Sequence, residues 1–298
     1  MSGAISFDQN LSAYNPSVRD YVTLLKPRVM SLVVFAGVAG LVVAPGTMHP
    51  LLALVAVLCI ALSAGGAAAI NMWYDRDIDA VMTRTRGRPL PQGRMAPNSA
   101  LEFGIVTSAG ASVIMALLIG WQAALWLTIA NLFYVFVYTL WLKRRTPQNI
   151  VIGGAAGAFP PVIGWAAATG ETGLAPWLLF ALIFIWTPPH FWALALYRAG
   201  DYGRAGVPMM PNVRGAKSTK IQTLIYTLLC APLAVSPYFI GIAGLVYLIV
   251  ASLLSVAFLV CAVRVLFSDK DKPAMQMFAF SILYLFVLLG TLMGDHLL

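Results

Sequence analysis

Long apolar runs alternate with short polar segments along almost the whole chain. About 20 consecutive apolar residues are enough for a helix to cross the hydrocarbon core of a bilayer. Nine such runs predict nine membrane-spanning helices, over residues 29–43, 51–74, 101–120, 121–142, 149–169, 174–197, 221–240, 241–266 and 275–294. The break between the seventh and eighth runs depends on Pro237 and Gly241. We therefore expect an all-α, polytopic membrane protein.

The polar segments give the chain a simple organisation. Residues 1–26 form a polar N-terminal arm, and residues 27–298 form a single nine-helix membrane domain that starts at Pro27. Ser99 and Glu102 have the spacing of a capping box, which predicts that the third helix opens near them. Pro160 with Pro161, and Pro188 with Pro189, free backbone groups at membrane depth and indicate the wall of a cavity.

Composition and charge fix the class and the orientation. With 60% hydrophobic and 10% charged residues among 298, the chain is too apolar for an ordinary soluble domain. All 19 Lys and Arg residues fall in the arm or in even-numbered loops, so nine helices place every basic residue on one side. The positive-inside rule makes that side cytoplasmic and puts the C-terminus outside. The net charge of +8 is then topological and predicts no nucleic-acid partner.

Three acidic residues interrupt this pattern at the end of the second apolar run. Asn71, Asp75 and Asp79 are spaced four apart, so a helix places their oxygens on one face, whereas Asp77 points elsewhere. Acids at a membrane edge need a cationic partner. This face suits Mg²⁺ bound partly by carboxylates and partly by the oxygens of a phosphorylated substrate.

A second polar end follows the sixth apolar run, where Tyr197, Asp201 and several basic residues stand close together in sequence. Four predicted helices separate it from the first acidic segment. An even number of crossings returns the chain to the same face, so we expect both segments to meet at one cytoplasmic mouth.

The motifs in this chain resemble those of a known protein family. Asn71-x3-Asp75-x3-Asp79, followed by Arg88-Pro-Leu-Pro-Gln-Gly-Arg94, resembles the first aspartate motif of the UbiA-type intramembrane prenyltransferases, which have nine helices around a central cavity. Within that superfamily, the stretches 142–157, 186–192 and 201–211 are similar to signatures of the protoheme IX farnesyltransferases, also called heme O synthases. The resemblance extends from about residue 25 to the C-terminus.

The resemblance implies a reaction and roles for individual residues. The farnesyl group of farnesyl diphosphate would be transferred to a vinyl group of heme b, a substrate, giving heme O and diphosphate. One or two diphosphate-bridged Mg²⁺ ions would be held by Asn71, Asp75, Asp79 and Asp201, and Lys143 would join them as a catalytic residue. Those implied to bind the diphosphate oxygens are Arg84, Arg88, Lys143 and Arg144. Those implied to contact heme or the prenyl chain are Tyr138, His190, Trp192 and Tyr197.

Two implied roles stay open at the level of sequence. The second motif has Ala205 four residues after Asp201, where many relatives carry further aspartates, so a second full carboxylate set is in doubt. His190 is either an axial heme ligand or a hydrogen-bonded histidine beside a proline pair, and we favour the second interpretation because prenylation of the porphyrin edge needs no iron ligand. Lys143, Arg144 and Arg145 would also exist for topology alone.

Two rival functions follow from the same residues. The first is a prenyltransferase of this fold with another aromatic or tetrapyrrole acceptor, and the second is a secondary transporter or heme-binding membrane module. Clustering of ionisable residues at one membrane face, away from the midplane, argues against transport. The expected surroundings are the lipid bilayer of a bacterial cytoplasmic (inner) membrane, with heme A synthase or terminal oxidase assembly proteins as partners.

Overall fold

A computed structural model describes residues 14–297, and these residues form helices and loops with no strand. Residues 1–13 of the predicted arm lie outside this description. The helices of the first half are α1 (Val18–Leu24), α2 (Pro27–Val42), α3 (Pro50–Tyr74), α4 (Arg76–Val81), α5 (Pro97–Leu118), α6 (Trp121–Leu132) and the π-helix η2 (Phe133–Leu142). Those of the second half are α7 (Asn149–Gly153), α8 (Ala155–Ala158), α9 (Pro160–Thr169), α10 (Leu174–Tyr197), α11 (Ala199–Arg204), α12 (Met210–Phe239), α13 (Leu245–Leu266) and α14 (Asp271–Leu297).

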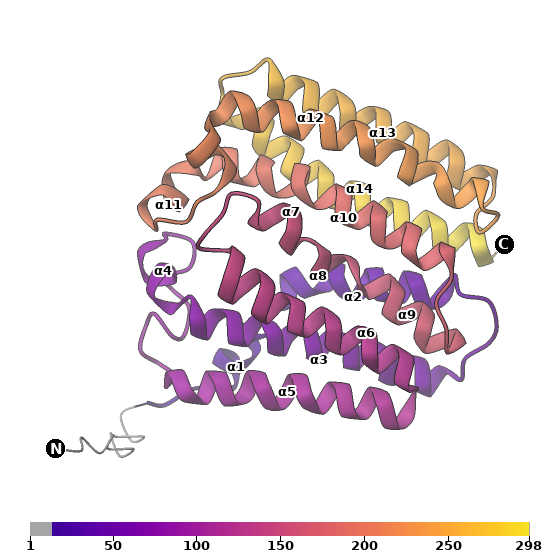
Figure 1. Ribbon diagram of the computed structural model, residues 1–298, viewed down its shortest axis with the longest axis horizontal. Helices are drawn as coiled ribbons and strands as arrows, with labels where there is room; N and C mark the ends of the chain where they lie inside the picture. Colours follow the sequence, from indigo (N-terminus) through magenta and orange to yellow (C-terminus); the bar gives the residue numbers. More distant parts are fainter. Residues whose placement is uncertain (1–13, 298) are drawn as a thin grey trace.

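The predicted set of apolar, membrane-spanning helices is confirmed in the described residues. Eight helical segments are long and apolar enough to cross a bilayer, and α1 and α2, joined at a bend of 53°, make a ninth when they are taken together as one span. The break near Pro237 and Gly241 is present, because α12 ends at Phe239 and α13 begins at Leu245. In Figure 1 the short helices α1, α4 and α11 lie at one end of the bundle and the C-terminus lies at the other.

Helix boundaries differ from the predicted runs where polar residues continue a helix. α5 begins at Pro97, with Ala96 as its N-cap and no side-chain cap, so the capping box predicted from Ser99 and Glu102 is wrong. Proline fits the first turn of a helix because its missing N–H would have no partner there. α12 begins at Met210 instead of residue 221, and Gly215 (φ 80°) kinks it.

The two proline pairs behave differently. The first lies in a span broken into α7, α8 and α9, and Pro160 opens α9. The second, Pro188 with Pro189, lies inside α10, which stays helical throughout, so this pair does not break its helix. Both pairs were expected to free backbone groups at a cavity wall, and only the first coincides with a break between helices.

The spanning helices close into a ring in which chain neighbours pack against one another and α14 returns to α2. α2 also crosses α9 closely. A Cβ on Gly40 would lie 2.1 Å from the Pro161 carbonyl oxygen, and one on Gly164 would lie 2.0 Å from that of Gly37. Glycine is therefore required at this crossing, as is usual where membrane helices approach backbone to backbone.

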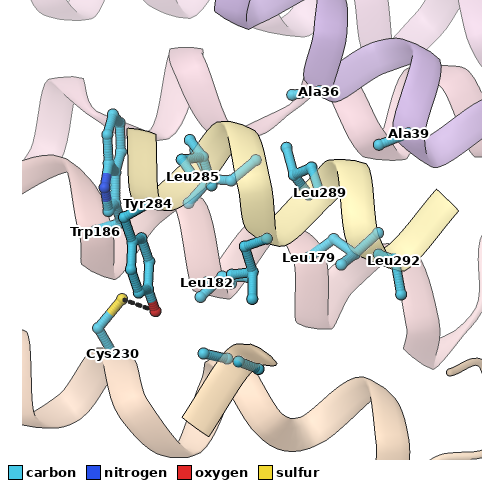
Figure 2. Close-up of a cluster of buried hydrophobic side chains, with 14 of the residues drawn as sticks. Ala36, Ala39, Leu179, Leu182, Trp186, Cys230, Tyr284, Leu285, Leu289 and Leu292 are labelled. Atoms are coloured by element: carbon cyan, nitrogen blue, oxygen red, sulfur yellow. Dashed lines mark hydrogen bonds between the residues drawn. The ribbon is translucent and has the colours of Figure 1, made fainter. Parts of the chain in front are cut away.

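The largest buried cluster fills the space between α10, α12, α14 and α2. Figure 2 shows Leu179 and Leu182 of α10 facing Leu285 and Leu289 of α14. Tyr284 contacts Cys230 of α12 through its hydroxyl at 3.9 Å. This apolar packing holds α10, α12 and α14 together against α2.

Candidate active site

Asn71, Asp75 and Asp79 form one buried polar surface, here called the carboxylate face. α3 ends at Tyr74, yet the Asp75 N–H still donates to the Asn71 carbonyl (2.9 Å) and the Asp79 N–H donates to the Asp75 carbonyl (2.8 Å). The four-residue repeat therefore continues into α4 and keeps the three side chains together. All three are buried, and Asp75 is 0% exposed. Asp77 points outward with its side chain 61% exposed.

Asp75 is surrounded by donors from two directions. The Asn71 amide donates to its Oδ2 at 2.7 Å, and the Lys143 ammonium forms an ion pair with the same oxygen. Arg144 Nη2 lies 3.3 Å from Oδ1. Because a buried carboxylate is tolerated only when it is paired and hydrogen-bonded, these contacts compensate for the burial of Asp75.

The end of η2 places Lys143. Its backbone N–H donates to the Tyr138 carbonyl, a π-type contact that closes this segment, and the Tyr138 ring lies 5.9 Å from the Lys143 ammonium. Gly153 of α7 makes room for that ring, since a Cβ there would lie 2.3 Å from Tyr138 Cδ2. π-helical turns often occur at functional sites.

Asp79 binds the loop that follows α4. Arg88 Nη1 lies 2.5 Å from Asp79 Oδ2, and the Thr85 hydroxyl donates to the Asp79 carbonyl at 2.9 Å. The loop therefore folds back over α4 and returns its arginine to the carboxylate face. Arg84 is exposed and makes no hydrogen bond or ion pair with any residue in the described range 14–297.

Lys26 is a member of the site that sequence analysis missed. Its ammonium donates to the Asn71 Oδ1 oxygen at 2.9 Å, while the Asn71 amide nitrogen donates to Asp75 and to the Thr139 hydroxyl (3.2 Å). Lys26 sits at the bend between α1 and α2 with φ 49°, the left-handed region that side chains other than glycine rarely adopt. From the sequence, Lys26 was used only as one of the basic residues that set the membrane orientation. Its position directly before Pro27, which starts a helix, was the one feature that could have pointed to the site.

Arg144 joins the carboxylate face to Asp77. Its guanidinium makes a two-point contact with Asp77 at 2.6 and 2.7 Å, donates to the Tyr74 carbonyl at 2.9 Å and lies 4.6 Å from the Tyr74 ring centre. The hydrogen bond from Arg144 holds the pKa of Asp77 below its ordinary value. Asp77 therefore orients Arg144 from the outside.

Asp201 lies at the same end of the bundle but has different partners. Its Oδ1 accepts from the Thr83 backbone N–H (3.0 Å) and from Arg204 (2.8 Å), and the carboxylate is 6% exposed. Its Oδ2 is buried without a hydrogen-bond partner in the described chain. The Arg198 guanidinium carbon lies 4.9 Å from the centre of the Tyr197 ring.

His190 and Trp192 lie deeper, on α10. His190 Nδ1 is 2.6 Å from the Ser281 hydroxyl, and its ring stacks between Trp186 and Phe278. Trp192 is fully buried and meets Tyr226 edge to face at 5.3 Å between ring centres. These contacts match a packed, hydrogen-bonded histidine, and they place neither side chain against the carboxylate face.

The donor set fits a magnesium ion that takes part of its shell from a ligand. Within residues 14–297, no three His, Cys, Asp or Glu side chains gather closely enough to hold a metal alone, so Asp201 does not join Asp75 and Asp79 in one such group. The carboxylate face does offer two carboxylates and an amide oxygen. Mg²⁺ is commonly bound by one or two carboxylates together with substrate phosphates, which is the set that this face can complete.

The fold and the site define a multi-pass membrane protein that gathers buried carboxylates and cations at one end of a helical bundle. The family model of the UbiA prenyltransferase family matches residues 32–288. The chain therefore belongs to the UbiA prenyltransferase family, and the predicted resemblance is confirmed.

Individual relatives agree with this membership. The chain is 56% identical over 282 residues to a protoheme IX farnesyltransferase of Agrobacterium fabrum, covering 93% of this chain and 89% of the relative. It is 51% identical over 312 residues to that of Gluconacetobacter diazotrophicus, covering 100% and 99%.

Solved structures share the fold at low identity. A structure of digeranylgeranylglyceryl phosphate synthase has a TM-score of 0.78 at 19% identity, covering 94% of this chain and 98% of its own. A UbiA homolog from Archaeoglobus fulgidus bound to GPP and Mg²⁺ has a TM-score of 0.67 at 17% identity, covering 92% and 99%. The predicted nine-helix prenyltransferase fold is thereby confirmed.

Proposed function

We propose that this chain transfers the farnesyl group of farnesyl diphosphate to a vinyl group of heme b, giving heme O and diphosphate. The observation that carries the proposal is the carboxylate face with its four cations, Lys26, Arg88, Lys143 and Arg144, which come from three separate segments of the chain. Relatives named protoheme IX farnesyltransferase, 51–56% identical over at least 93% of the chain, support the choice of substrates.

The reaction requires cleavage of the bond between farnesyl C1 and the diphosphate oxygen, and the bonding electrons leave with that oxygen. The vinyl π electrons of heme b then form a new carbon–carbon bond with farnesyl C1. Water adds its oxygen to the other vinyl carbon and releases a proton, which leaves a hydroxyethylfarnesyl group. The difficult step is the first one, because negative charge accumulates on the departing diphosphate.

The cations of the site suit this charge. Lys26, Arg88 and Lys143 each donate to an oxygen of the carboxylate face, and the same N–H groups can bind phosphate oxygens. Arg144 is held in place by Asp77 and Tyr74, so its guanidinium is preorganised. Asn71, Asp75 and Asp79 would hold Mg²⁺, which, when bound, neutralises the diphosphate as a leaving group.

The remaining residues define where the organic groups would lie. An apolar groove of about 650 Å³ lies between α2 and α14, and Leu32, Phe35 and Phe286 are among its lining residues. Its α2 wall belongs to the helix that begins directly after Lys26. This supports a prenyl chain that extends from the cations along α2. Tyr134 and Tyr138, 5.2 Å apart beside Lys143, present aromatic faces that can stabilise an allylic cation.

Asp201 and Arg84 have supporting roles in this proposal. Asp201 holds the loop after α4 through Thr83, and its unpartnered Oδ2 is a further oxygen for a second cation. Arg84, in the same loop, carries a charge that is not engaged in the described chain and can reach an incoming anion. His190 remains a packing residue, because its Nδ1 is engaged by Ser281.

The setting follows from the same evidence. The spanning helices make this a multi-pass membrane protein, and the bacterial relatives support the cytoplasmic (inner) membrane. A transport function has no specific support, because α4 and α11, which carry the paired acids Asp79 and Asp201, lie at one end of the bundle (Figure 1). Heme A synthase and terminal oxidase assembly proteins remain proposed partners for the product.

The test is conversion of heme b by the purified full chain with farnesyl diphosphate and Mg²⁺, followed by chromatography and mass spectrometry of the porphyrin together with a diphosphate assay. We expect one heme O and one diphosphate per turnover, and loss of both with EDTA. Deuteroheme, which lacks vinyl groups, is the matched acceptor and should remain unmodified. Farnesylation of an unrelated aromatic acceptor with no conversion of heme b would contradict the proposal.

A further inference from the structure

Two of the four cations reach the carboxylate face from segments that are tied together outside it. Lys26 follows α1, and Arg88 lies in the loop between α4 and α5. The link is an ion pair between Asp20 of α1 and Arg94 at the end of that loop, with Nε 3.0 Å from Asp20 Oδ1. Asp20 is only 6% exposed, which is unusual for an acid in a short surface helix.

Each partner is also fixed to its own segment. Asp20 Oδ2 accepts from the backbone N–H and the hydroxyl of Ser17, which caps α1, and its Oδ1 is left for Arg94. Arg94 Nη2 donates to the Gly87 carbonyl at 3.4 Å, next to Arg88. The Asp20–Arg94 ion pair therefore joins α1 to the 82–94 loop. Within that loop, Arg94 is bound to Gly87, the residue before Arg88.

Apolar contacts lie alongside this link. Leu24 of α1 is fully buried in a cluster with Met72 of α3 and with Leu90 and Met95 from the loop and its end. Two residues after Leu24 the chain turns at Lys26 in its left-handed conformation. A conformation of this kind persists only where the surroundings hold it, and the docked α1 supplies that support.

We propose that the Asp20–Arg94 ion pair is a positioning device that holds α1 and the 82–94 loop together, so that Lys26 and Arg88 meet a diphosphate as one preorganised pair. This inference rests on the proposed function and deepens it. Neither Asp20 nor Arg94 contacts the carboxylate face. Their contribution is to the affinity for the anion and not to the bond-breaking step.

The first measurement uses Arg94→Gln, Asp20→Asn and the double variant of the full chain. Each single change should raise KM for farnesyl diphosphate about tenfold, the ratio that corresponds to 1.4 kcal/mol, with kcat within about twofold. KM of the double variant should be no higher than that of the more affected single variant, because both changes remove the same interaction. The matched control is Lys220→Gln, which breaks the ion pair with Asp269 elsewhere and should leave KM unchanged.

The second measurement does not depend on turnover. Hydrogen exchange of backbone amides in α1 and in the 82–94 loop should rise together in Arg94→Gln, and calorimetry should show weaker binding of farnesyl diphosphate with Mg²⁺. An unchanged KM together with unchanged hydrogen exchange would overturn the positioning role. A tenfold fall in kcat without a change in KM would overturn it as well. If the wild-type chain bound no farnesyl diphosphate, the proposed function would fail, while the exchange measurement would still decide whether the pair joins the two segments.

Discussion

The end of α3 and the end of α10 have the same local design and different surroundings. At each, a spanning helix stops and a six-residue helix follows, α4 after α3 and α11 after α10. α4 follows Asp75 and contains Asp79, and both carboxylates are buried against cations from other parts of the chain. α11 contains Asp201, whose charged partner Arg204 belongs to the same short helix.

This difference indicates that the α3 end, and not the α10 end, is suited to pass its cations from a carboxylate to a bound phosphate. Cations that arrive from distant segments can turn from a carboxylate to a phosphate without unfolding the helix that carries the acid. Asp201 instead accepts a backbone N–H from Thr83, so it anchors one loop to another. Ala205 stands where a second acid would match Asp79, and the α10 end therefore keeps one carboxylate only. The comparison predicts a steep ranking of mutational effects.

The largest effect should come from Asp75→Asn. The change leaves Lys143 and Arg144 without their buried counter-charge and removes one carboxylate from the carboxylate face. We expect kcat to fall about 10³-fold, the scale found when a preorganised electrostatic contact is removed. Heme O formation in a single-turnover assay measures this. Asp269→Asn is the matched control, because this exposed acid pairs with Lys220 away from the carboxylate face, and it should stay within about threefold of wild type.

An intermediate effect is expected for Lys26→Met, which removes the ammonium that contacts Asn71 and keeps an apolar stem of similar length. KM for farnesyl diphosphate should rise about 30-fold, roughly 2 kcal/mol, because one partner of a part-buried, charged hydrogen bond is lost. Steady-state kinetics at saturating heme b measure it. Arg28→Gln removes a neighbouring exposed cation and should have no such effect. An equal KM in the two variants would place Lys26 outside the site.

The sequence was sufficient for the scaffold because the apolar runs and the placement of basic residues depend on the membrane alone. Asn71, Asp75 and Asp79 were also predictable, since a four-residue spacing on a helix determines a common face. Their partners were not. Lys26 lies 45 residues from Asn71, and its lysine was indistinguishable from a topological charge until the bend at Pro27 brought it to the amide.

Local rules misled where a longer-range contact or a neighbouring residue competed with them. Ser99 and Glu102 fit a capping box, but Pro97 starts the helix two residues earlier and leaves them inside it. Pro188 and Pro189 were expected to free backbone groups at a cavity wall, whereas α10 is packed on α12 and α14 and stays helical. The π-helical turn before Lys143 has no signature that spacing alone can reveal.

The smallest effect should come from Asp201→Asn, and it tests the α10 end directly. Asparagine keeps an oxygen for the Thr83 N–H but loses the charge that binds Arg204. We expect kcat/KM to fall about fivefold, roughly 1 kcal/mol, which is far less than for Asp75→Asn. A loss as large as that of Asp75→Asn would show that Asp201 contributes as much to catalysis as the carboxylate face does and is more than a supporting residue.

The pH dependence sharpens the same comparison. Burial alone would raise the pKa of Asp201, but hydrogen bonds from Thr83 and Arg204 hold it below its ordinary value. A carboxylate with a lowered pKa stabilises the fold above its ordinary pKa and loses that contribution as the pH falls through the lowered value. The gap between wild type and Asp201→Asn in hydrogen exchange at Thr83 should therefore be constant from about pH 5 to 8 and close only below about pH 4. A gap that closed near neutral pH would show that Asp201 is not held by these hydrogen bonds.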